Sequence, residues 1–380
     1  MTPYLRAANV ADGSLLLDDV KTMNFTPAEQ RRYALEPRDV LVTEGSGSRG
    51  TVGASAAWPG SDEPTMCQNT LIRLRARAHV DPSFLYWWSR HAYGSGVYAA
   101  AAQGLAIWHL SAERVRALPF VDLAIDEQRR IADFLDDQVA RLDRALAVRS
   151  NQGSLLRERV LEALESAYSP ALNRASAVPL GRLLKSSPCY GVLVPVFEEA
   201  GVPFCRVGSL TDLDNGFLPE VFISSAQSLE YRRTQVEPGD VLTSVVGSLG
   251  VSAIVPDHAK GVNVARAVAR LQPARGVPSW FLRGYLSTRS FRDSAALATG
   301  GGTAQPTLNM GDLVKFAVGN ATDVDMMRNV AFAAESLSRQ QAAGLSAIGR
   351  SARLLEERKQ ALITAAVTGQ FDVTAARSVA

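Results

Sequence analysis

The segment from Gly45 to Thr51 (GSGSRGT) has the glycine spacing G-x-G-x-x-G of loops that cradle nucleotide phosphates. Such a loop must open a helix whose N-terminus faces the phosphates. Here Val52-Gly53-Ala54 and then Trp58-Pro59-Gly60 follow, and the lysine of a nucleotide-binding loop is absent. We therefore predict a flexible hairpin loop, whose backbone N–H groups and Arg49 can approach a DNA phosphate instead.

No other set of residues has the spacing of a reaction centre. The four histidines are scattered without metal-ligand spacing, and the three cysteines show no paired spacing; these residues are His79, His91, His109 and His258, and Cys67, Cys189 and Cys205. The cysteines are interpreted as small core residues. A nucleophile elbow, an H-E-x-x-H pair and an Asp-Pro-Pro-Tyr-type loop are all missing. This pattern favours recognition over catalysis.

Two further stretches have residues suited to nucleic acid. Trp108 and His109 lie in a segment that corresponds to the polar run from Gly302 to Thr307, where Thr and Gln side chains can reach base edges. An ordinary solvated loop is the alternative. Arg73, Arg75 and Arg77 alternate in a predicted strand and so share one face, for which a solvated face is the simpler interpretation.

The chain repeats itself with a lag of roughly 200 residues, and such periods are tested before any fold is assigned. The matched segments keep their order throughout: Tyr4–Val10 with Phe204–Leu210, Glu36–Leu41 with Glu237–Leu242, Gly47–Gly50 with Gly247–Gly250, and Gly104–Ser111 with Gly302–Asn309. Each copy is predicted to be a mixed domain of short strands, in which the first matched segment is a strand. Each should also contain one amphipathic helix, near Pro82–Tyr98 or Pro278–Ala298.

A long helix is predicted after each copy, from Asp126 to about Tyr168 and from about Thr322 to Thr368. Apolar residues repeat at heptad spacing in both: Ile131, Leu135, Val139, Leu142, Leu146, Leu156, Val160, Ala163 and Ala167, then Val330, Ala334, Leu337, Leu345, Ile348, Ala352, Leu355, Leu362 and Ala366. At 1.5 Å per residue each would reach on the order of 60 Å and needs a partner of similar length. The order of the elements favours an antiparallel pair, and two helices in separate bundles remain the alternative.

The predicted fold class is thus α+β, with two mixed α/β domains separated by two long antiparallel coiled-coil helices around a pseudo-two-fold axis. The expected boundaries are a first domain over 1–122, a first long helix over 123–172, a second domain over 178–318, a second long helix over 322–370 and a tail over 371–380. About two dozen residues that precede the second copy have no counterpart before the first. This predicts either a misassigned start or a truncated first domain.

Composition bounds the function without deciding it. The 380 residues are 47% hydrophobic and 21% charged, enough for substantial cores. No apolar run approaches the roughly 18 residues that span a bilayer, and the start lacks a signal-peptide pattern, so a cytoplasmic location is expected. A net charge of +2 permits nucleic-acid binding without requiring it.

The chain resembles the specificity subunits of type I restriction-modification systems. The resemblance rests on the two-copy layout and on four local matches: Tyr4–Val10, Asp39–Leu41 with its Gly-rich loop, Asp126–Asp136 with Glu-Gln-x-x-Ile-Ala, and Glu357–Gly369 with Ala-Val-Thr-Gly. The sequence departs from the family pattern where the second long helix begins without Glu-Gln. It also departs where Gly104-Leu105-Ala106 replaces the Gly-Thr-x-Gln found at Gly302–Gln305.

The resemblance implies a non-catalytic chain in which each domain is a target recognition domain for one half of a split, asymmetric DNA sequence. The long helices would act as a ruler between the half-sites. Two adenine methyltransferase subunits and restriction subunits with ATPase and nuclease activity would be its partners. S-adenosylmethionine, ATP and Mg would be used by those partners, with no cofactor bound by this chain.

Candidate DNA-binding residues follow from the matched loops. They are Arg6, Asn9, Ser46, Ser48, Arg49, Trp108, His109, Arg206, Ser209, Ser244, Ser248, Thr303 and Gln305. The alternative function is a non-catalytic scaffold or degenerate decoy that binds methyltransferase subunits without reading DNA.

Overall fold

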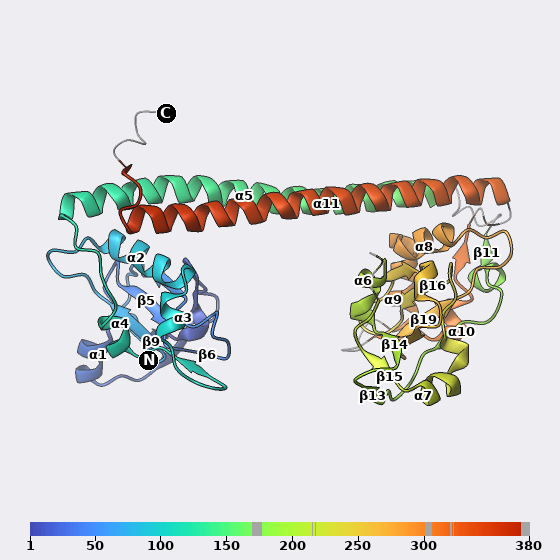
Figure 1. Cartoon of the computed structure of the whole chain (residues 1–380), viewed down its shortest axis with the longest axis horizontal. Helices are drawn as coiled ribbons and strands as arrows, with labels where there is room; N and C mark the ends of the chain where they lie inside the picture. Colours follow the sequence, from blue (N-terminus) through green and yellow to red (C-terminus); the bar gives the residue numbers. More distant parts are fainter. Residues whose placement is uncertain are drawn as a thin grey trace. The chain divides into compact units, whose positions relative to one another are not determined.

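The computed structural model describes residues 1–168, 177–214, 216, 218–300, 306–319, 321 and 323–373. The chain forms two compact units, one of Met1–Ser150 with Gly349–Ala380 and the other of Asn151–Ile348. Each unit contains one mixed domain and part of each of two long helices, α5 (Ile125–Tyr168) and α11 (Val324–Val367) (Figure 1). The units therefore divide the chain within the helices, and the domain boundaries expected from sequence stay predictions.

The first domain is built on two small sheets with strand orders β7-β5-β9 and β4-β1-β8, followed by short helices. Its strands and helices are β1 (Thr2–Leu5), η1 (Ala7–Asn9), β2 (Val10–Ala11), β3 (Ser14–Leu15), β4 (Lys21–Met23), α1 (Pro27–Tyr33), β5 (Val40–Thr43), β6 (Gly45–Ser46), β7 (Ser55–Ala57), β8 (Met66–Cys67), β9 (Leu71–Leu74), α2 (Pro82–Gly94), α3 (Val97–Ala101), β10 (Trp108–His109) and α4 (Ala112–Arg116).

The second domain contains sheets with strand orders β12-β19-β16-β17 and β13-β15-β14-β18. Its elements are β11 (Val178–Pro179), η4 (Leu180–Leu183), β12 (Cys189–Tyr190), β13 (Phe197–Glu198), β14 (Val202–Cys205), η5 (Val207–Ser209), α6 (Leu210–Asp214), β15 (Phe222–Ile223), α7 (Ser225–Glu230), η6 (Arg232–Thr234), β16 (Val241–Ser244), β17 (Ser252–Ile254), η7 (Asp257–Ala259), β18 (Asn263–Val264), β19 (Val268–Leu271), α8 (Ser279–Ser287), α9 (Arg289–Ala298), α10 (Met310–Leu313) and β20 (Ala317–Val318).

The two domains share one topology, which confirms the internal repeat. In the first, β5 pairs antiparallel with β7 and β9, and in the second β16 pairs antiparallel with β17 and β19. Strands β1 and β14 are equally matched, since each has one antiparallel neighbour (β4 or β15) and one parallel neighbour (β8 or β18). The second domain adds β12 and β13 at sheet edges, without counterparts in the described part of the first domain.

The predicted single amphipathic helix is wrong in both copies, because each is two helices. In the first domain α2 ends at Gly94 and α3 starts after Gly96, whose φ of +79° turns the chain. In the second, Thr288 separates α8 from α9 and its side chain accepts a hydrogen bond from the N–H of Phe291 at 3.2 Å. Apolar periodicity continues through both breaks, so it does not reveal them.

The predicted strand from Tyr4 to Val10 is also interrupted. Strand β1 ends at Leu5, and the 3-10 turn η1 follows because the Asn9 side chain accepts a hydrogen bond from the Arg6 N–H at 3.1 Å. The matching segment behaves alike, with β14 ending at Cys205 and η5 following. The correspondence between the copies therefore holds, although the assigned strand was too long.

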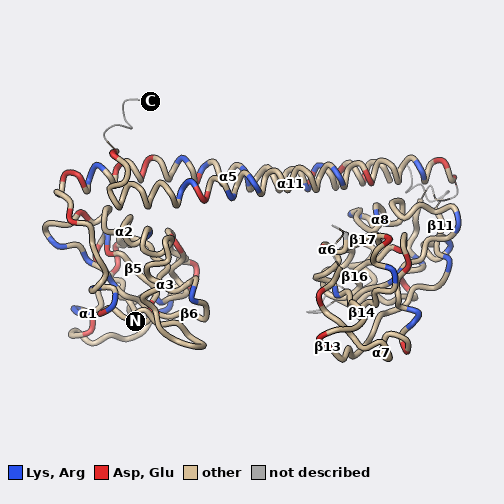
Figure 2. The backbone as a smooth tube through the Cα atoms, in the orientation of Figure 1, with Lys and Arg blue, Asp and Glu red and all other residues tan. Residues whose placement is uncertain are grey.

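The two long helices run antiparallel within each unit. In the first unit, Lys359 Nζ lies 3.0 Å from Asp143 Oδ1, and Arg149 Nε lies 3.1 Å from Ser351 Oγ. In the second unit, Gly344 faces Leu156 of α5. All the predicted seam residues are buried or half-buried, as expected for facing heptad stripes. Basic and acidic residues are interspersed along the remaining helix surface (Figure 2).

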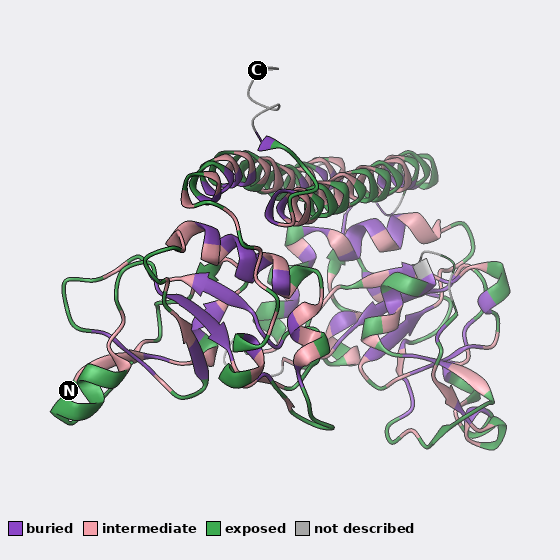
Figure 3. Ribbon diagram, turned by 60° about the vertical axis from the view of Figure 1, so that its left-hand side comes forward, coloured by how far each residue is buried: buried purple, intermediate pink, exposed green. Residues whose placement is uncertain are grey.

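In the first unit, α2 packs against both long helices. Phe84, Trp87 and Trp88 share one buried cluster with Ile131 and Leu135 of α5 and with Ile363 of α11. Buried positions line the inward faces of these helices and of the sheets (Figure 3). The Trp87 indole N–H donates to Asp136 Oδ1 at 2.9 Å, which fixes the angle of the ring against α5.

Gln128 of the Glu-Gln motif holds the start of α5 to the start of α2. Its side chain is buried; its oxygen accepts from the Asp81 N–H at 2.8 Å and its amide donates to the carbonyls of Leu123 and His79 at 2.8 and 3.2 Å. At the corresponding place in α11 stands Met327, which is buried among apolar residues. The loss of Glu-Gln in the second copy thus exchanges a polar anchor for an apolar one.

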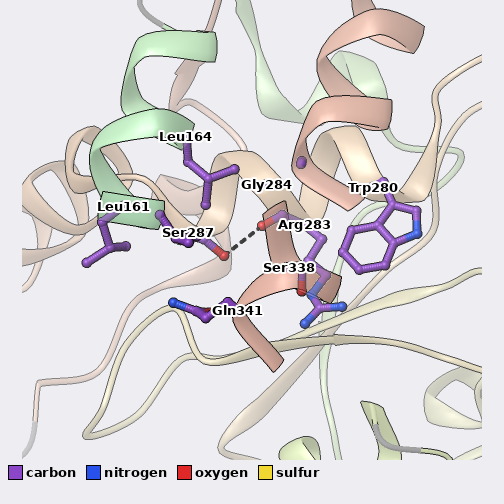
Figure 4. A pocket seen from close by; sticks show the side chains of 10 residues that line it. Leu161, Leu164, Trp280, Arg283, Gly284, Ser287, Ser338 and Gln341 are labelled. Carbon is purple, nitrogen blue, oxygen red and sulfur yellow. Dashed lines mark hydrogen bonds between the residues drawn. The ribbon is translucent and has the colours of Figure 1, made fainter. Parts of the chain in front are cut away.

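In the second unit, α8 occupies the place that α2 has in the first. Phe281 and Tyr285 of α8 pack with Tyr168 of α5 and Val330 of α11, and Tyr168 Oη donates to the Phe281 carbonyl at 2.6 Å. Burial raises the pKa of the Tyr168 phenol, which therefore stays protonated. A small cavity of about 170 Å³ lies beside this contact (Figure 4). Figure 4 shows around it Leu161, Leu164, Trp280, Arg283, Gly284, Ser287, Ser338 and Gln341.

Gly284 sets how closely α8 approaches the long helices. A Cβ there would collide with Tyr168 Oη and lie 2.9 Å from Ala334 Cβ. We expect Gly284→Ala to destabilise the chain by about 1–3 kcal/mol through overpacking, measured by chemical denaturation. Gly349→Ala is the matched control, since this helical glycine has open space around it and should gain up to about 1 kcal/mol. Equal effects of the two substitutions would contradict the close packing.

Candidate nucleic-acid interface

The Gly-rich loop of the first domain is held by a short ribbon. Strand β6 pairs antiparallel with β10, with Ser46 opposite Trp108, and the Leu110 N–H donates to the Glu44 carbonyl at 2.7 Å. The loop itself joins β5 to β7, so the predicted hairpin is confirmed and no helix follows the glycines. The sequence did not indicate the pairing with β10. It brings together five candidate contacts: Ser46, Ser48, Arg49, Trp108 and His109.

Arg49 is the exposed cation of this loop. Its guanidinium carbon lies 5.0 Å from the centre of the Trp108 ring, and its Nε donates to the Ala99 carbonyl at 3.0 Å. The stacking and the hydrogen bond restrict the side chain before any ligand arrives. Within the described residues its terminal amino groups have no hydrogen-bond partner, so they are free to bind a phosphate.

The backbone of the loop is partly satisfied by its own side chains. Ser46 Oγ accepts from the Ser48 N–H and Ser48 Oγ accepts from the Gly50 N–H, both at 3.3 Å. Ser46 Oγ also contacts Thr51 Oγ1. Two of the N–H groups expected to face a phosphate are thus already used. The charge available at this loop comes from Arg49.

The second domain repeats the ribbon with different residues. Val246 forms an antiparallel bridge with Thr307, the Gly247 N–H donates to the Pro306 carbonyl at 2.9 Å, and the Leu308 N–H donates to the Val245 carbonyl at 2.8 Å. Ser248 is exposed in this loop. The candidate contacts Thr303 and Gln305 lie outside the described residues.

The structure aligns the glycines of the β5–β7 loop and the β16–β17 loop differently from the match made in sequence. Gly53 and Gly250 both have positive φ, +89° and +83°, and donate to the carbonyls of Thr43 and Ser244. A Cβ at either would press on the ring of an aromatic residue, Tyr98 or Phe291. Gly250 therefore corresponds to Gly53, and the pairing with Gly50 was wrong because the first loop is longer.

Two predicted contacts serve the fold instead. Asn9 is 2% exposed, and its amide donates to the carbonyls of Leu16 and Asp19 at 2.8 and 3.2 Å. Ser244 is fully buried; its hydroxyl accepts from the Val251 N–H at 2.9 Å and donates to the Ser248 carbonyl. Neither side chain faces solvent, so we remove both from the candidate DNA contacts.

Arg6 and Arg206 take equivalent places after β1 and β14. Arg6 forms an ion pair with Asp19 at 2.6 Å, while Arg206 is exposed. A hydrogen bond from Lys21 holds the pKa of Asp19 below its ordinary value, so this carboxylate stays charged beside Arg6. Ser209 is half-buried at the end of η5. Within the described residues, no hydrogen bond joins Arg6 to the β6–β10 ribbon of its own domain.

A shallow hollow of about 320 Å³ separates the segment after β1 from the loop. Ala7, Asp12, Ser46 and Tyr93 are among its lining residues. Asp12 accepts a hydrogen bond from Arg90 Nη2 at 3.1 Å and lies 2.7 Å from its Nε. Burial raises the pKa of Asp12, although Arg90 acts in the opposite direction. The sequence gave no sign of this concave surface.

Arg73 of β9 and Arg75, which follows the end of this strand at Leu74, hold a turn. Arg73 Nη1 donates to the Ala34 carbonyl at 2.6 Å, and Arg75 contacts both oxygens of Asp39 at 2.7 and 2.6 Å and also pairs with Glu36. In the second domain Arg270 stands at the strand position of Arg73, and its Nε donates to Asp240 at 2.6 Å. The solvated-face interpretation is therefore wrong for half-buried Arg73, while Arg75 is exposed and paired at the same time.

The remaining reactive side chains do not form a centre. In the part of the chain that is described, no group of three or more His, Cys, Asp or Glu side chains could hold a metal ion. Cys67 and Cys205 are buried as predicted, and burial raises the pKa of Cys205 to about 12; Cys189 is half-buried. Among the described helices, none combines the length and apolarity that a bilayer crossing requires.

The fold and the loops define a class of duplicated protein, in which two mixed domains of one topology each carry a loop ribbon and adjoin a pair of long helices. The chain has 18% identity to a chain in a structure entitled "Structural basis underlying complex assembly and conformational transition of the type I R-M system", with a TM-score of 0.70 over 96% of this chain and 91% of that one. It has 18% identity to the HsdS subunit from Thermoanaerobacter tengcongensis, with a TM-score of 0.51 over 97% and 91%.

A curated relative agrees with the structural comparison. The chain is 24% identical over 311 residues to the type I restriction enzyme EcoBI specificity subunit of Escherichia coli, which covers 74% of this chain and 63% of that protein. The chain thus spans less than two thirds of the length of this relative. No family model matches the sequence. The resemblance to type I specificity subunits noted from the motifs is confirmed.

The two contacts of Arg75 with Asp39 yield a stability prediction. The Asp39 side chain is 1% exposed, so Arg75→Ala would leave a buried carboxylate short of a partner. We expect a loss of about 2 kcal/mol in the free energy of unfolding. Arg77→Ala, an exposed change just beyond the strand, should stay within about 0.5 kcal/mol. Urea denaturation of both variants checks this, and similar losses would contradict the assignment.

Proposed function

We propose that the chain is the non-catalytic DNA specificity subunit of a type I restriction-modification complex. It reads an asymmetric two-part DNA target and positions adenine methyltransferase and restriction subunits. S-adenosylmethionine, ATP and Mg are used by those partners and not by this chain. The duplicated topology supports this proposal most strongly, because one domain plan with two unlike loops suits two unlike half-sites.

The loop chemistry supports DNA as the ligand. In the first domain, the restrained Arg49 offers its terminal amino groups to a phosphate, and Ser48 and His109 are exposed nearby on the same ribbon. In the second domain, the bridge of Val246 with Thr307 places exposed Ser248 in an equivalent loop. A two-stranded ribbon is narrow enough to enter the major groove.

The long helices support the positioning role. Each has 44 residues and so extends about 65 Å, close to two turns of B-DNA. Both present a polar outer surface on which exposed apolar residues stand singly, such as Val148 on α5 and Leu354 on α11. We propose that these surfaces dock two copies of one methyltransferase subunit.

Methylome sequencing of a host that carries this chain with its neighbouring methyltransferase gene tests the proposal. The expected result is one methylated motif with two different parts around a fixed gap. Binding of the purified complex to that motif should weaken steeply with salt, because phosphate contacts release counterions. A different result would favour the decoy function. In that case the chain assembles with methyltransferase subunits, but no motif is methylated and all duplexes bind equally.

The ruler has its own test. Inserting one heptad into both helices at the contact of Arg149 with Ser351 adds about 10 Å, or about three base pairs, between the half-sites. The methylated motif should keep both parts and lengthen its gap by that amount. Replacing seven residues at the same places, without a change of length, is the control and should leave the gap as it was. A gap that does not respond to the insertion contradicts the ruler.

A further inference from the structure

A tight hairpin stands beside the Gly-rich loop of the first domain. The Gln103 N–H donates to the His109 carbonyl at 2.9 Å and the His109 N–H donates to the Gln103 carbonyl at 2.7 Å. Gly104 turns the chain with a φ of +150°, where a Cβ would collide with the Ile107 carbonyl oxygen. The hairpin is thus fixed by its backbone, and His109 also pairs with β6.

Apolar side chains form the tip of this hairpin. Leu105 is fully exposed, with a relative accessibility of 102%, and Ile107 is 57% exposed. Exposure alone decides little, because Leu229 on α7 of the second domain is 67% exposed. The position of the tip is the stronger argument for a ligand. The tip adjoins Trp108, whose ring stacks with the Arg49 guanidinium, and residues 103–109 include no carboxylate. The tip therefore adds no negative charge beside the Arg49 cation, which suits a polyanionic ligand.

The internal repeat shows what the tip replaces. Gly104–Ser111 matches Gly302–Asn309 in sequence, so Leu105 stands at the position of Thr303 and Ile107 at that of Gln305. The second copy therefore has hydrogen-bonding residues where the first has aliphatic ones. If both segments contact base edges, the second copy would form hydrogen bonds there and the first would form apolar contacts.

We propose that Leu105 and Ile107 contact thymine methyl groups in the major groove, so that the first domain recognises thymine by its methyl group at one or two positions of its half-site. Apolar side chains recognise the thymine C5-methyl group there, and a glutamine amide pairs with adenine N6 and N7. Gln103 at the base of the hairpin is exposed and supplies that amide. The inference rests on the proposed function and adds the chemistry of one base pair to it.

The test uses the assembled complex of this chain with its methyltransferase subunits and a duplex that carries the methylated motif. Each thymine of both half-sites is replaced in turn by deoxyuridine, which removes only the methyl group. We expect the substitution to weaken binding roughly fourfold at one or two positions of a single half-site. This factor corresponds to the loss of one buried methyl group. Leu105→Ala, or Ile107→Ala where that side chain makes the contact, should abolish this sensitivity while assembly is retained.

Two further variants sharpen the result. Leu229→Ala removes a comparably exposed leucine from the second domain and should keep the full uracil sensitivity. A double change of Leu105→Thr and Ile107→Gln, which installs the residues of the second copy, should lose it and shift the base preference of that half-site.

Three outcomes overturn the inference. Wild-type binding that is specific but insensitive to every uracil removes the methyl contact and leaves the proposed function intact. Failure of Leu105→Ala and Ile107→Ala to assemble with methyltransferase subunits assigns the tip to a protein contact instead. Equal binding of wild type to all duplexes would reject the proposed function itself.

Discussion

The packing of one domain helix into the groove between two antiparallel long helices is the interaction on which the rest of each unit depends. In the first unit Trp87 and His91 of α2 contact Asp136 of α5 and Thr364 of α11. In the second, Phe281 and Tyr285 of α8 pack against Tyr168 of α5. A long helix with a narrow apolar seam cannot bury enough surface alone. The third helix completes the core, and it also fixes the sheets and loops that the domain presents.

The two copies solve this packing with different chemistry. The first uses directed hydrogen bonds from Gln128 and Trp87, whereas the second uses Met327, the Tyr168 phenol and the close approach that Gly284 permits. Directed bonds and close contacts both allow little variation in geometry. Each domain is therefore held rigidly within its own unit, which suits loops that must meet a ligand at fixed places.

The loops show how two domains of one topology can present different side chains to a ligand. The ribbon is made by backbone pairing in both domains, so its position does not depend on which side chains it carries. Side chains on the ribbon can then change from polar to apolar between copies without cost to the fold. Arg49 and Trp108 stack on the ribbon of the first copy, whereas Val246 and Thr307 form the bridge in the second.

The sequence by itself determined the repeat, the two long helices and their seams, because heptad periodicity and matched turns depend on local spacing alone. It also indicated the hairpin at Gly45, since no helix could follow those glycines. Only the tertiary structure decided which candidate side chains are available: Asn9 and Ser244 fill internal hydrogen bonds, Arg75 holds a turn, and β10 crosses to β6. The contacts of Arg75 and of β10 join residues tens of positions apart, so no local pattern contains them. Asn9 and Ser244 bond residues close in sequence, but their burial depends on the surrounding domain.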